Sequence, residues 1–132
     1  MVIDSSAILA ILLLESDAET FAEAIETDPT RLVSAVSFLE VSIVIQARKG
    51  GAGGRELDLL LHRAGVEIAS FTGEQAELAA AAWLHYGKGR HPAGLNLGDC
   101  CSYALAKVSG ERLLYKGQDF AKTDVAAWRP LL

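Results

Sequence analysis

The segment Met1–Glu15 reads MVIDSSAILAILLLE, and it contains the structural unit from which the rest of the fold can be predicted. The apolar stretch MVID predicts a short buried strand that ends at Asp4. The stretch SSAILAILLLE predicts a helix with Asp4 or Ser5 as its N-cap, because Asp and Ser are favoured at that position. A strand followed at once by a helix is the repeating unit of α/β domains.

The same alternation continues along the chain. Further strands are predicted at residues 31–35, 66–70 and 112–117, and further helices at residues 17–27, 36–50, 55–65, 72–87 and 96–110. The glycine-rich stretch GGAGG, residues 50–54, predicts a flexible connection, and residues 118–132 predict a turn, a short helical piece and a tail. The expected fold is therefore one α/β domain, residues 1–132, with a central, mostly parallel sheet flanked by helices.

Composition narrows the class of protein. The chain has 132 residues, of which 51% are hydrophobic, so a folded domain is expected, with part of its surface covered by a partner. A net charge of -5 does not favour a general nucleic-acid coat protein, but it is compatible with an enzyme that holds phosphates through metal ions. The adjacent Cys100 and Cys101 match no zinc spacing and favour a reducing compartment. Residues 7–14 are too short to span a membrane and lack a basic leader, so a cytoplasmic protein is predicted.

Glu40 is the least expected residue in the chain. It lies in AVSFLEVSIVIQ, residues 35–46, within a predicted helix that is apolar nearly all round and hence expected to be buried. Burying a lone carboxylate costs several kcal/mol unless it is paired or binds a cation. No basic residue occurs between Glu40 and Arg48, so no partner is available on the same helix. A metal ion or a salt bridge to a distant Lys or Arg are the two alternatives.

Three further acids are expected at one edge of the sheet. Asp4 ends the first strand, Asp99 lies in the first turn of a helix capped by Asn96, and Asp119 follows the last strand. Each acid alone has an ordinary explanation, as a cap, a capping box or a turn residue. Together with Glu40 they would repel one another without a cation, and ligands in such sheets bind beyond the carboxyl ends of the strands. Hard oxygen donors suit Mg²⁺ or Mn²⁺.

Four motifs, in this order, resemble those of a known family: MVIDSSAILAIL, SFLEV, LNLGDCCSYALAK and LLYKGQDF followed by TDV. They resemble PIN-domain ribonucleases, in particular the VapC-type toxins of bacterial toxin–antitoxin pairs, over essentially the whole chain. The resemblance implies a PIN fold and a metal-dependent endoribonuclease with an RNA substrate and a cognate antitoxin protein. It implies Mg²⁺ or Mn²⁺ as the cofactor.

The resemblance also implies which residues form the site. Catalytic residues would be Asp4, Glu40, Asp99 and Asp119, of which the three aspartates bind metal and Glu40 does so directly or through water. Ser6 matches the small hydroxyl residue that follows the first acid. The fourth position is open, because relatives vary there: some have an acid where this chain has Gly117, and Asp124 is a second candidate.

Phosphodiester hydrolysis needs no histidine, because one or two divalent ions can stabilise the charge that develops on the attacking and leaving oxygens. Lys88 and Arg90, in the loop KGRHP before Asp99, are expected to contact the RNA backbone, with solubilising charges as the alternative. Lys116, beside the last acid, is expected to contact phosphate or to pair with a carboxylate.

Two other functions fit parts of the sequence. An aspartyl phosphatase of the haloacid-dehalogenase type would use Asp4 as its nucleophile, but it requires an acid where this chain has Ser6, and it leaves Glu40 without a role. A non-catalytic binding module would use the acids as caps and salt bridges. In the nuclease interpretation, the apolar helix SSAILAILLLE needs cover on more than one side, which predicts a homodimer that also binds a helical antitoxin segment.

Overall fold

The computed structural model describes residues 1–128, so the last four residues of the predicted tail lie outside it. The strands are β1 (Val2–Ile3), β2 (Leu32–Ser34), β3 (Glu67–Ala69) and β4 (Leu113–Leu114). The helices are α1 (Ser5–Leu12), α2 (Ala18–Thr27), α3 (Ala35–Arg63), α4 (Gly73–Tyr86), α5 (Leu97–Ser109) and the 3₁₀ helix η1 (Phe120–Lys122). Among the described helices, none combines the length and the apolar character needed to cross a membrane.

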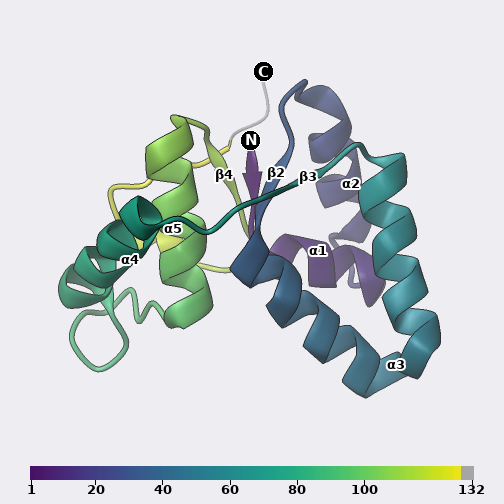
Figure 1. Cartoon of the computed structure of the whole chain (residues 1–132), viewed down its shortest axis with the longest axis horizontal. Coiled ribbons are helices and arrows are strands. Elements are labelled where there is room, and N and C mark those ends of the chain that lie inside the picture. The colour runs from purple at the N-terminus through teal and green to yellow at the C-terminus, as the bar shows by residue number, and fades with distance from the viewer. Residues whose placement is uncertain (129–132) are drawn as a thin grey trace.

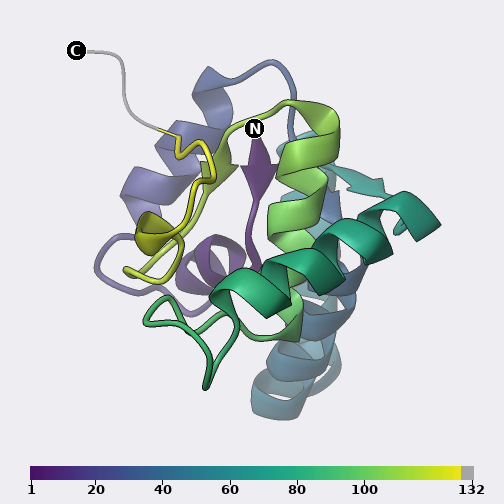
Figure 2. The same ribbon diagram turned by 90° about the vertical axis from the view of Figure 1, so that its left-hand side faces the viewer.

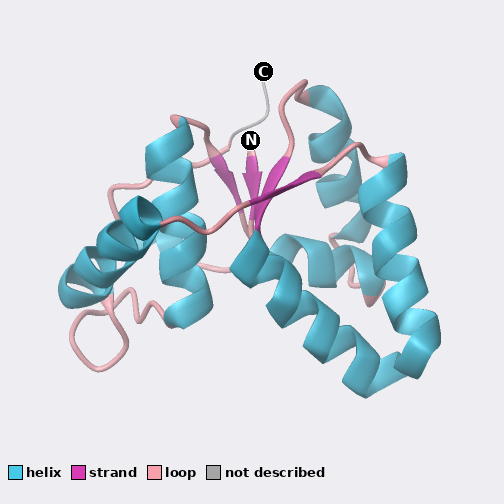
Figure 3. Cartoon of the chain, viewed as in Figure 1, coloured by secondary structure: helices cyan, strands magenta, loops and turns pink. Residues whose placement is uncertain are grey.

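The strands form one parallel sheet in the order β3-β2-β1-β4. The first strand of the chain is therefore an inner strand, and Val2 pairs with both Leu32 and Leu113. Figures 1 and 3 show the sheet between two groups of helices, with α1, α2 and α3 on one side and α4 and α5 on the other. The predicted α/β class and the parallel sheet are confirmed.

The core has two parts, one on each face of the sheet. Successive residues of a strand point to opposite faces, and accordingly Ile3 packs with Ile8 and Ile45 whereas Val2 packs with Leu95 and Ala104. Both β1 residues are fully buried, as expected when helices cover both faces of a parallel sheet. The end of β1 is therefore held rigidly at the centre of the molecule.

The predicted flexible connection at residues 50–54 is wrong. These residues belong to α3, which departs from helical geometry only at Gly50, with φ 63° and ψ -153°. Figure 1 shows the resulting bend, which divides α3 into two arms, residues 35–49 and residues 51–63. A Cβ atom at Gly53 would lie 2.6 Å from the carbonyl oxygen of Ile45, so glycine permits the close approach of the arms. Packing between the arms outweighs the low helix propensity of glycine.

Two expectations about apolar helices also need correction. The first arm of α3 is buried on one face only, because Leu39 and Ile43 are 58% and 62% exposed whereas Val41 and Ile45 are buried. Helix α1 is largely covered within the chain, where Ile8 is buried in the core. The apolar character of α1 is therefore explained by its own domain and does not by itself require a partner.

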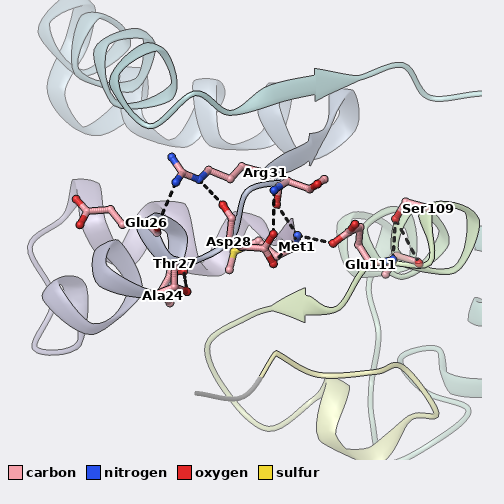
Figure 4. A network of polar contacts seen from close by, with 10 residues as sticks. Met1, Ala24, Glu26, Thr27, Asp28, Arg31, Ser109 and Glu111 are labelled. Carbon is pink, nitrogen blue, oxygen red and sulfur yellow. Dashed lines mark hydrogen bonds and ion pairs between the residues drawn. The ribbon is translucent and has the colours of Figure 1, made fainter. Parts of the chain in front are cut away.

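An ion-pair network lies where β1 begins (Figure 4). The amino group of Met1 donates to the carbonyl oxygen of Thr30 and to Glu111 Oε2, both at 2.6 Å, and it lies 3.1 Å from Asp28 Oδ2. Arg31 donates to the carbonyl oxygens of Asp28 and Glu26 in the same region. The network joins the β1 start to the segments that precede β2 and β4.

Candidate functional site

Asp4 lies at the other end of β1 and is only 1% exposed. Its Oδ2 atom accepts hydrogen bonds from the Ser6 amide at 3.0 Å and from Ser6 Oγ at 2.6 Å, while Oδ1 accepts one from Ser102 Oγ at 2.6 Å. Asp4 is thus the N-cap of α1, as its sequence context allowed. A carboxylate oxygen has two lone pairs, so Oδ1 retains one for a cation. The cap and a metal ligand are compatible roles.

Asp99 begins α5 through a complete capping box. The Asp99 amide donates to Asn96 Oδ1 at 2.9 Å, and the Asn96 amide donates to Asp99 Oδ2 at 3.0 Å. Burial raises the pKa of Asp99 to about 6, with the charges of Asp4, Asp119 and Glu40 adding to the increase against the opposing hydrogen bond from Asn96. The other three acids therefore each act electrostatically on Asp99.

The two candidates for the fourth acid have different surroundings. Asp119 is exposed at the start of η1, makes no side-chain capping bond and raises the pKa of Asp99. Asp124 instead accepts hydrogen bonds from the Tyr103 hydroxyl and the Lys107 amine, which lower the pKa of its carboxyl group. Asp124 is therefore already paired with a cation, whereas Asp119 is one of the acids whose charge raises the pKa of Asp99.

The Glu40 carboxylate lies against the first turn of α5. A Cβ atom at Gly98 would be 2.7 Å from Glu40 Oε1 and 2.9 Å from Oε2, so the missing side chain of Gly98 makes room for this carboxylate. Oε1 is buried without a hydrogen-bond partner among the described residues, which also contain no ion pair to Glu40. The N-terminal end of a helix favours negative charge. Glu40 also lines an open pocket of about 470 Å³ with Leu39 and Ile43.

The four acids do not form a preassembled metal site. Within residues 1–128, no group of three or more His, Cys, Asp or Glu side chains is arranged so that it could hold an ion. The donor chemistry nevertheless fits a hard divalent cation. The side-chain donors are carboxylate oxygens, one of which is buried without a partner, and burial together with the charges of the other acids raises the pKa of Asp99. Mg²⁺ commonly keeps several water ligands and needs only one or two carboxylates.

Ser6 and Lys116 connect Asp4 to the segment after β4. The Ser6 hydroxyl donates to Asp4 and accepts a hydrogen bond from the Lys116 amide at 3.0 Å. The Lys116 amine forms ion pairs with Glu15 and Asp17, and hydrogen bonds to these two acids raise its pKa. Lys116 was expected either to contact phosphate or to pair with a carboxylate, and in the structure it pairs with carboxylates.

The loop between α4 and α5 (Figure 2) contains Lys88 and Arg90, the two residues predicted from the sequence to bind RNA. The Arg90 guanidinium lies 5.0 Å from the centre of the Trp83 ring, and Arg90 Nε donates to the carbonyl oxygen of Leu84 at 3.3 Å. Lys88 is exposed. No hydrogen bond or ion pair joins Lys88 or Arg90 to the four acids in the part of the chain that the structure describes.

Two residues of this region were missed at the level of sequence. Ser102 donates to Asp4 and lies 3.0 Å, oxygen to oxygen, from Ser37, and both serines are fully buried. Single serines in apolar helices are common, so the residue type alone does not mark either serine as functional. Their spacing is the available signal: Ser102 lies three residues after Asp99, and Ser37 lies three residues before Glu40.

Known proteins identify the family. A family model for the PIN domain matches residues 1–126. Ribonuclease VapC30 of Mycobacterium tuberculosis is 58% identical over 126 residues, which cover 96% of each chain. Ribonuclease VapC of Mycolicibacterium smegmatis is 58% identical over 127 residues, which cover 96% of this chain and 98% of the relative. The chain therefore belongs to the PIN-domain family, and within it to the VapC ribonucleases.

Solved structures with little sequence identity share the fold. VapC20 of Mycobacterium tuberculosis, described as a sarcin-ricin loop cleaving toxin, superposes with a TM-score of 0.77 at 17% identity and covers 98% of each chain. VapBC2 from Rickettsia felis, bound to a DNA fragment from its promoter, has a TM-score of 0.74 at 14% identity and covers 96% of this chain and 94% of the other. The predicted PIN fold is confirmed.

Proposed function

We propose that this protein is an endoribonuclease toxin that hydrolyses RNA phosphodiester bonds, depends on Mg²⁺ or Mn²⁺, and is neutralised by a cognate antitoxin protein. The observation that carries the proposal is the 58% identity to VapC ribonucleases over nearly the full length of both chains. Family membership leaves the phosphatase alternative without support, and Ser6 is a hydrogen-bond donor to Asp4 where that chemistry requires an acid.

The proposed metal ligands are Asp4, Asp99 and Asp119, with Glu40 coordinating directly or through water. A divalent ion at this place would stabilise the charge that develops on the attacking and leaving oxygens of the phosphodiester. The orphaned oxygen of Glu40 and the raised pKa of Asp99 support the assignment, because a bound cation would offset both. The number of ions, one or two, is left open.

The protein residues hold and orient the reacting groups. Three hydrogen bonds from Ser6 and Ser102 fix the plane of the Asp4 carboxylate, and the capping box fixes Asp99. We assign Lys88 and Arg90 to the phosphate backbone of RNA, since both are exposed and cationic. The contact with Trp83 holds the Arg90 guanidinium in place while leaving it accessible for phosphate.

We further propose a homodimer and a cytoplasmic location. The exposed apolar side chains of Leu39, Ile43 and Leu97 support a self-association surface, in place of the α1 helix that first suggested one. Sedimentation of the purified chain at micromolar concentration is expected to give a dimer, and a strictly monomeric species would contradict this proposal. The free, buried Cys100 and Cys101 agree with a compartment that keeps thiols reduced.

An RNA cleavage assay tests the proposed activity. The parent should cleave RNA with Mg²⁺ or Mn²⁺ and lose that activity in excess EDTA, because the carboxylates alone supply no replacement for the ion. Asp4→Asn should reduce the rate by orders of magnitude with the fold intact by circular dichroism. Asp124→Asn is the matched control, since Asp124 pairs with Tyr103 and Lys107 away from the other acids. Full activity in EDTA would defeat the proposal.

A further inference from the structure

Two buried serines connect the elements that carry three of the acids. Ser102 belongs to α5, which carries Asp99, and its hydroxyl donates to Asp4 Oδ1 at the end of β1. Ser37 belongs to α3, which carries Glu40, and its hydroxyl lies 3.0 Å from that of Ser102. Three residues are nearly one helical turn, so each serine lies on the same side of its helix as the acid beside it.

The direction of the two hydrogen bonds follows from the charge of Asp4. An ionised carboxylate only accepts hydrogen bonds, so Ser102 must donate its single hydroxyl hydrogen to Asp4 Oδ1. Ser102 then has no hydrogen left for Ser37, and Ser37 must donate to Ser102. The chain Ser37 to Ser102 to Asp4 therefore has one allowed direction while Asp4 is ionised. Donation from Ser37 also polarises Ser102 and strengthens its bond to the carboxylate.

We propose that Ser37 and Ser102 are positioning residues that set the distances among Glu40, Asp99 and Asp4, and that Ser37 acts on the site only through Ser102. This inference rests on the proposed function, because it assigns the serines to the placement of the metal-binding acids. Both serines have 0% exposure, so water does not replace a deleted hydroxyl without rearrangement. A purely structural pair of buried serines would affect stability and leave the reaction rate of the folded protein unchanged.

The test uses five variants of the full chain: Ser102→Ala, Ser37→Ala, the double Ser37→Ala/Ser102→Ala, Ser37→Thr, and Ser42→Ala as the control. Ser42 lies on the same helix, two residues after Glu40, and no side-chain hydrogen bond of Ser42 is found among residues 1–128. RNA cleavage is measured at saturating Mg²⁺, well below each melting temperature, so that kcat and KM refer to folded protein. Mn²⁺ affinity is measured separately by calorimetry without RNA.

Ser102→Ala should lower kcat and weaken Mn²⁺ binding by roughly 10–100-fold, the usual effect of removing a residue that orients a metal ligand. KM for RNA should hardly change. Ser37→Ala should have a smaller effect of the same kind, and Ser37→Thr, which keeps the hydroxyl, should restore most of the loss. The double variant should match Ser102→Ala, because Ser37 has no route to Asp4 once Ser102 Oγ is gone.

Two results would overturn the inference. One is a folded Ser37→Ala protein whose kcat and Mn²⁺ affinity equal those of Ser42→Ala. The other is a double variant whose losses are the product of the two single losses, which would mean that Ser37 acts independently of Ser102. In both cases the parent still cleaves RNA, so the proposed function stands. A parent that neither binds Mn²⁺ nor cleaves RNA would instead overturn the proposed function, and the inference with it.

Discussion

Acidic side chains lie near both ends of β1, but the charges around them differ. Where the strand begins, Asp28 and Glu111 face the positive amino group of Met1. Burial would raise the pKa of Asp28, but the Thr30 amide and the charged amino group outweigh it and lower that pKa. Where the strand ends, Asp99 faces only other acids among its charged neighbours, and its pKa rises to about 6. The first end gains stability from its charges, whereas the second holds its charges together against their repulsion.

The largest expected contrast comes from neutralising one acid at each end. Glu40→Gln should abolish RNA cleavage while leaving the free energy of unfolding in EDTA unchanged or higher, because it removes one of the repelling charges and strands no cation. Added Mg²⁺ should then stabilise the parent by mass action and the variant less. Urea unfolding with and without Mg²⁺, together with the cleavage assay, measures both effects.

Glu111→Gln is the control from the other end. It should leave cleavage intact and reduce stability by about 1 kcal/mol, because the hydrogen bond to the Met1 amino group loses its charge on one side. A loss of about 3–5 kcal/mol in EDTA for Glu40→Gln, with activity retained by the folded fraction, would mean that Glu40 is a buried salt-bridge partner instead.

Replacing either of two glycines by alanine is expected to change stability by a smaller amount. Gly54→Ala should stabilise α3 by about 0.5–1 kcal/mol, since alanine favours helix and the nearest neighbour is the Gln46 side chain at 3.6 Å. Gly98→Ala should gain less stability and lose cleavage activity, because its methyl group displaces the Glu40 carboxylate from the first turn of α5.

The pairing of Gly98 with Glu40 can be isolated by repeating the substitution without the carboxylate. In a Glu40→Ala background, Gly98→Ala should recover the full gain in unfolding free energy, measured by urea titration. A Gly98→Ala protein with parental cleavage activity would show that the Glu40 carboxylate does not need the space left by the missing side chain of Gly98.

The smallest effect is a pH dependence of opposite sign at the two ends. The folded pKa of Asp99 lies above its ordinary value, so its contribution to stability is present below about pH 4 and is lost as pH rises through about 6. In EDTA, Asp99→Asn should therefore gain melting temperature relative to the parent as pH rises from 4 to 8. The folded pKa of Asp28 is lowered, so Asp28→Asn should lose melting temperature relative to the parent above pH 4. Parallel curves for the two variants would contradict the contrast.

The positions of Asp4 and Asp99 could be predicted from sequence because each follows from a local rule. Asp4 ends an apolar strand, and Asn96 with Asp99 forms a capping box, so both are placed at element ends without knowledge of distant contacts. The preference for Asp119 over Asp124 as the proposed fourth ligand rests on the structure, because it depends on the contacts of Asp124 with Tyr103 and Lys107.

The features that escaped prediction depend on contacts between distant segments. The serine pair joins residues 65 positions apart, and the link from Ser102 to Asp4 spans 98 positions. The glycine stretch after Lys49 was expected to be flexible because its local propensity is poor for helix, whereas Gly53 is what allows the arms of α3 to touch. The exposure of Leu39 and Ile43 also depends on which neighbours α3 has.

The inner position of β1 has a consequence during translation. Val2 and Ile3 are made about 110 residues before their partners Leu113 and Leu114, so one edge of this strand stays unpaired until those two have been synthesised. At about 5–20 residues per second this interval is roughly 5–20 seconds. The backbone bond from the Asp4 amide to the Leu114 carbonyl oxygen closes only then, and the contact of Ser102 with Asp4 can form only shortly before, once α5 has been made. A nascent chain therefore cannot complete the surroundings of Asp4 until Leu114 has been synthesised.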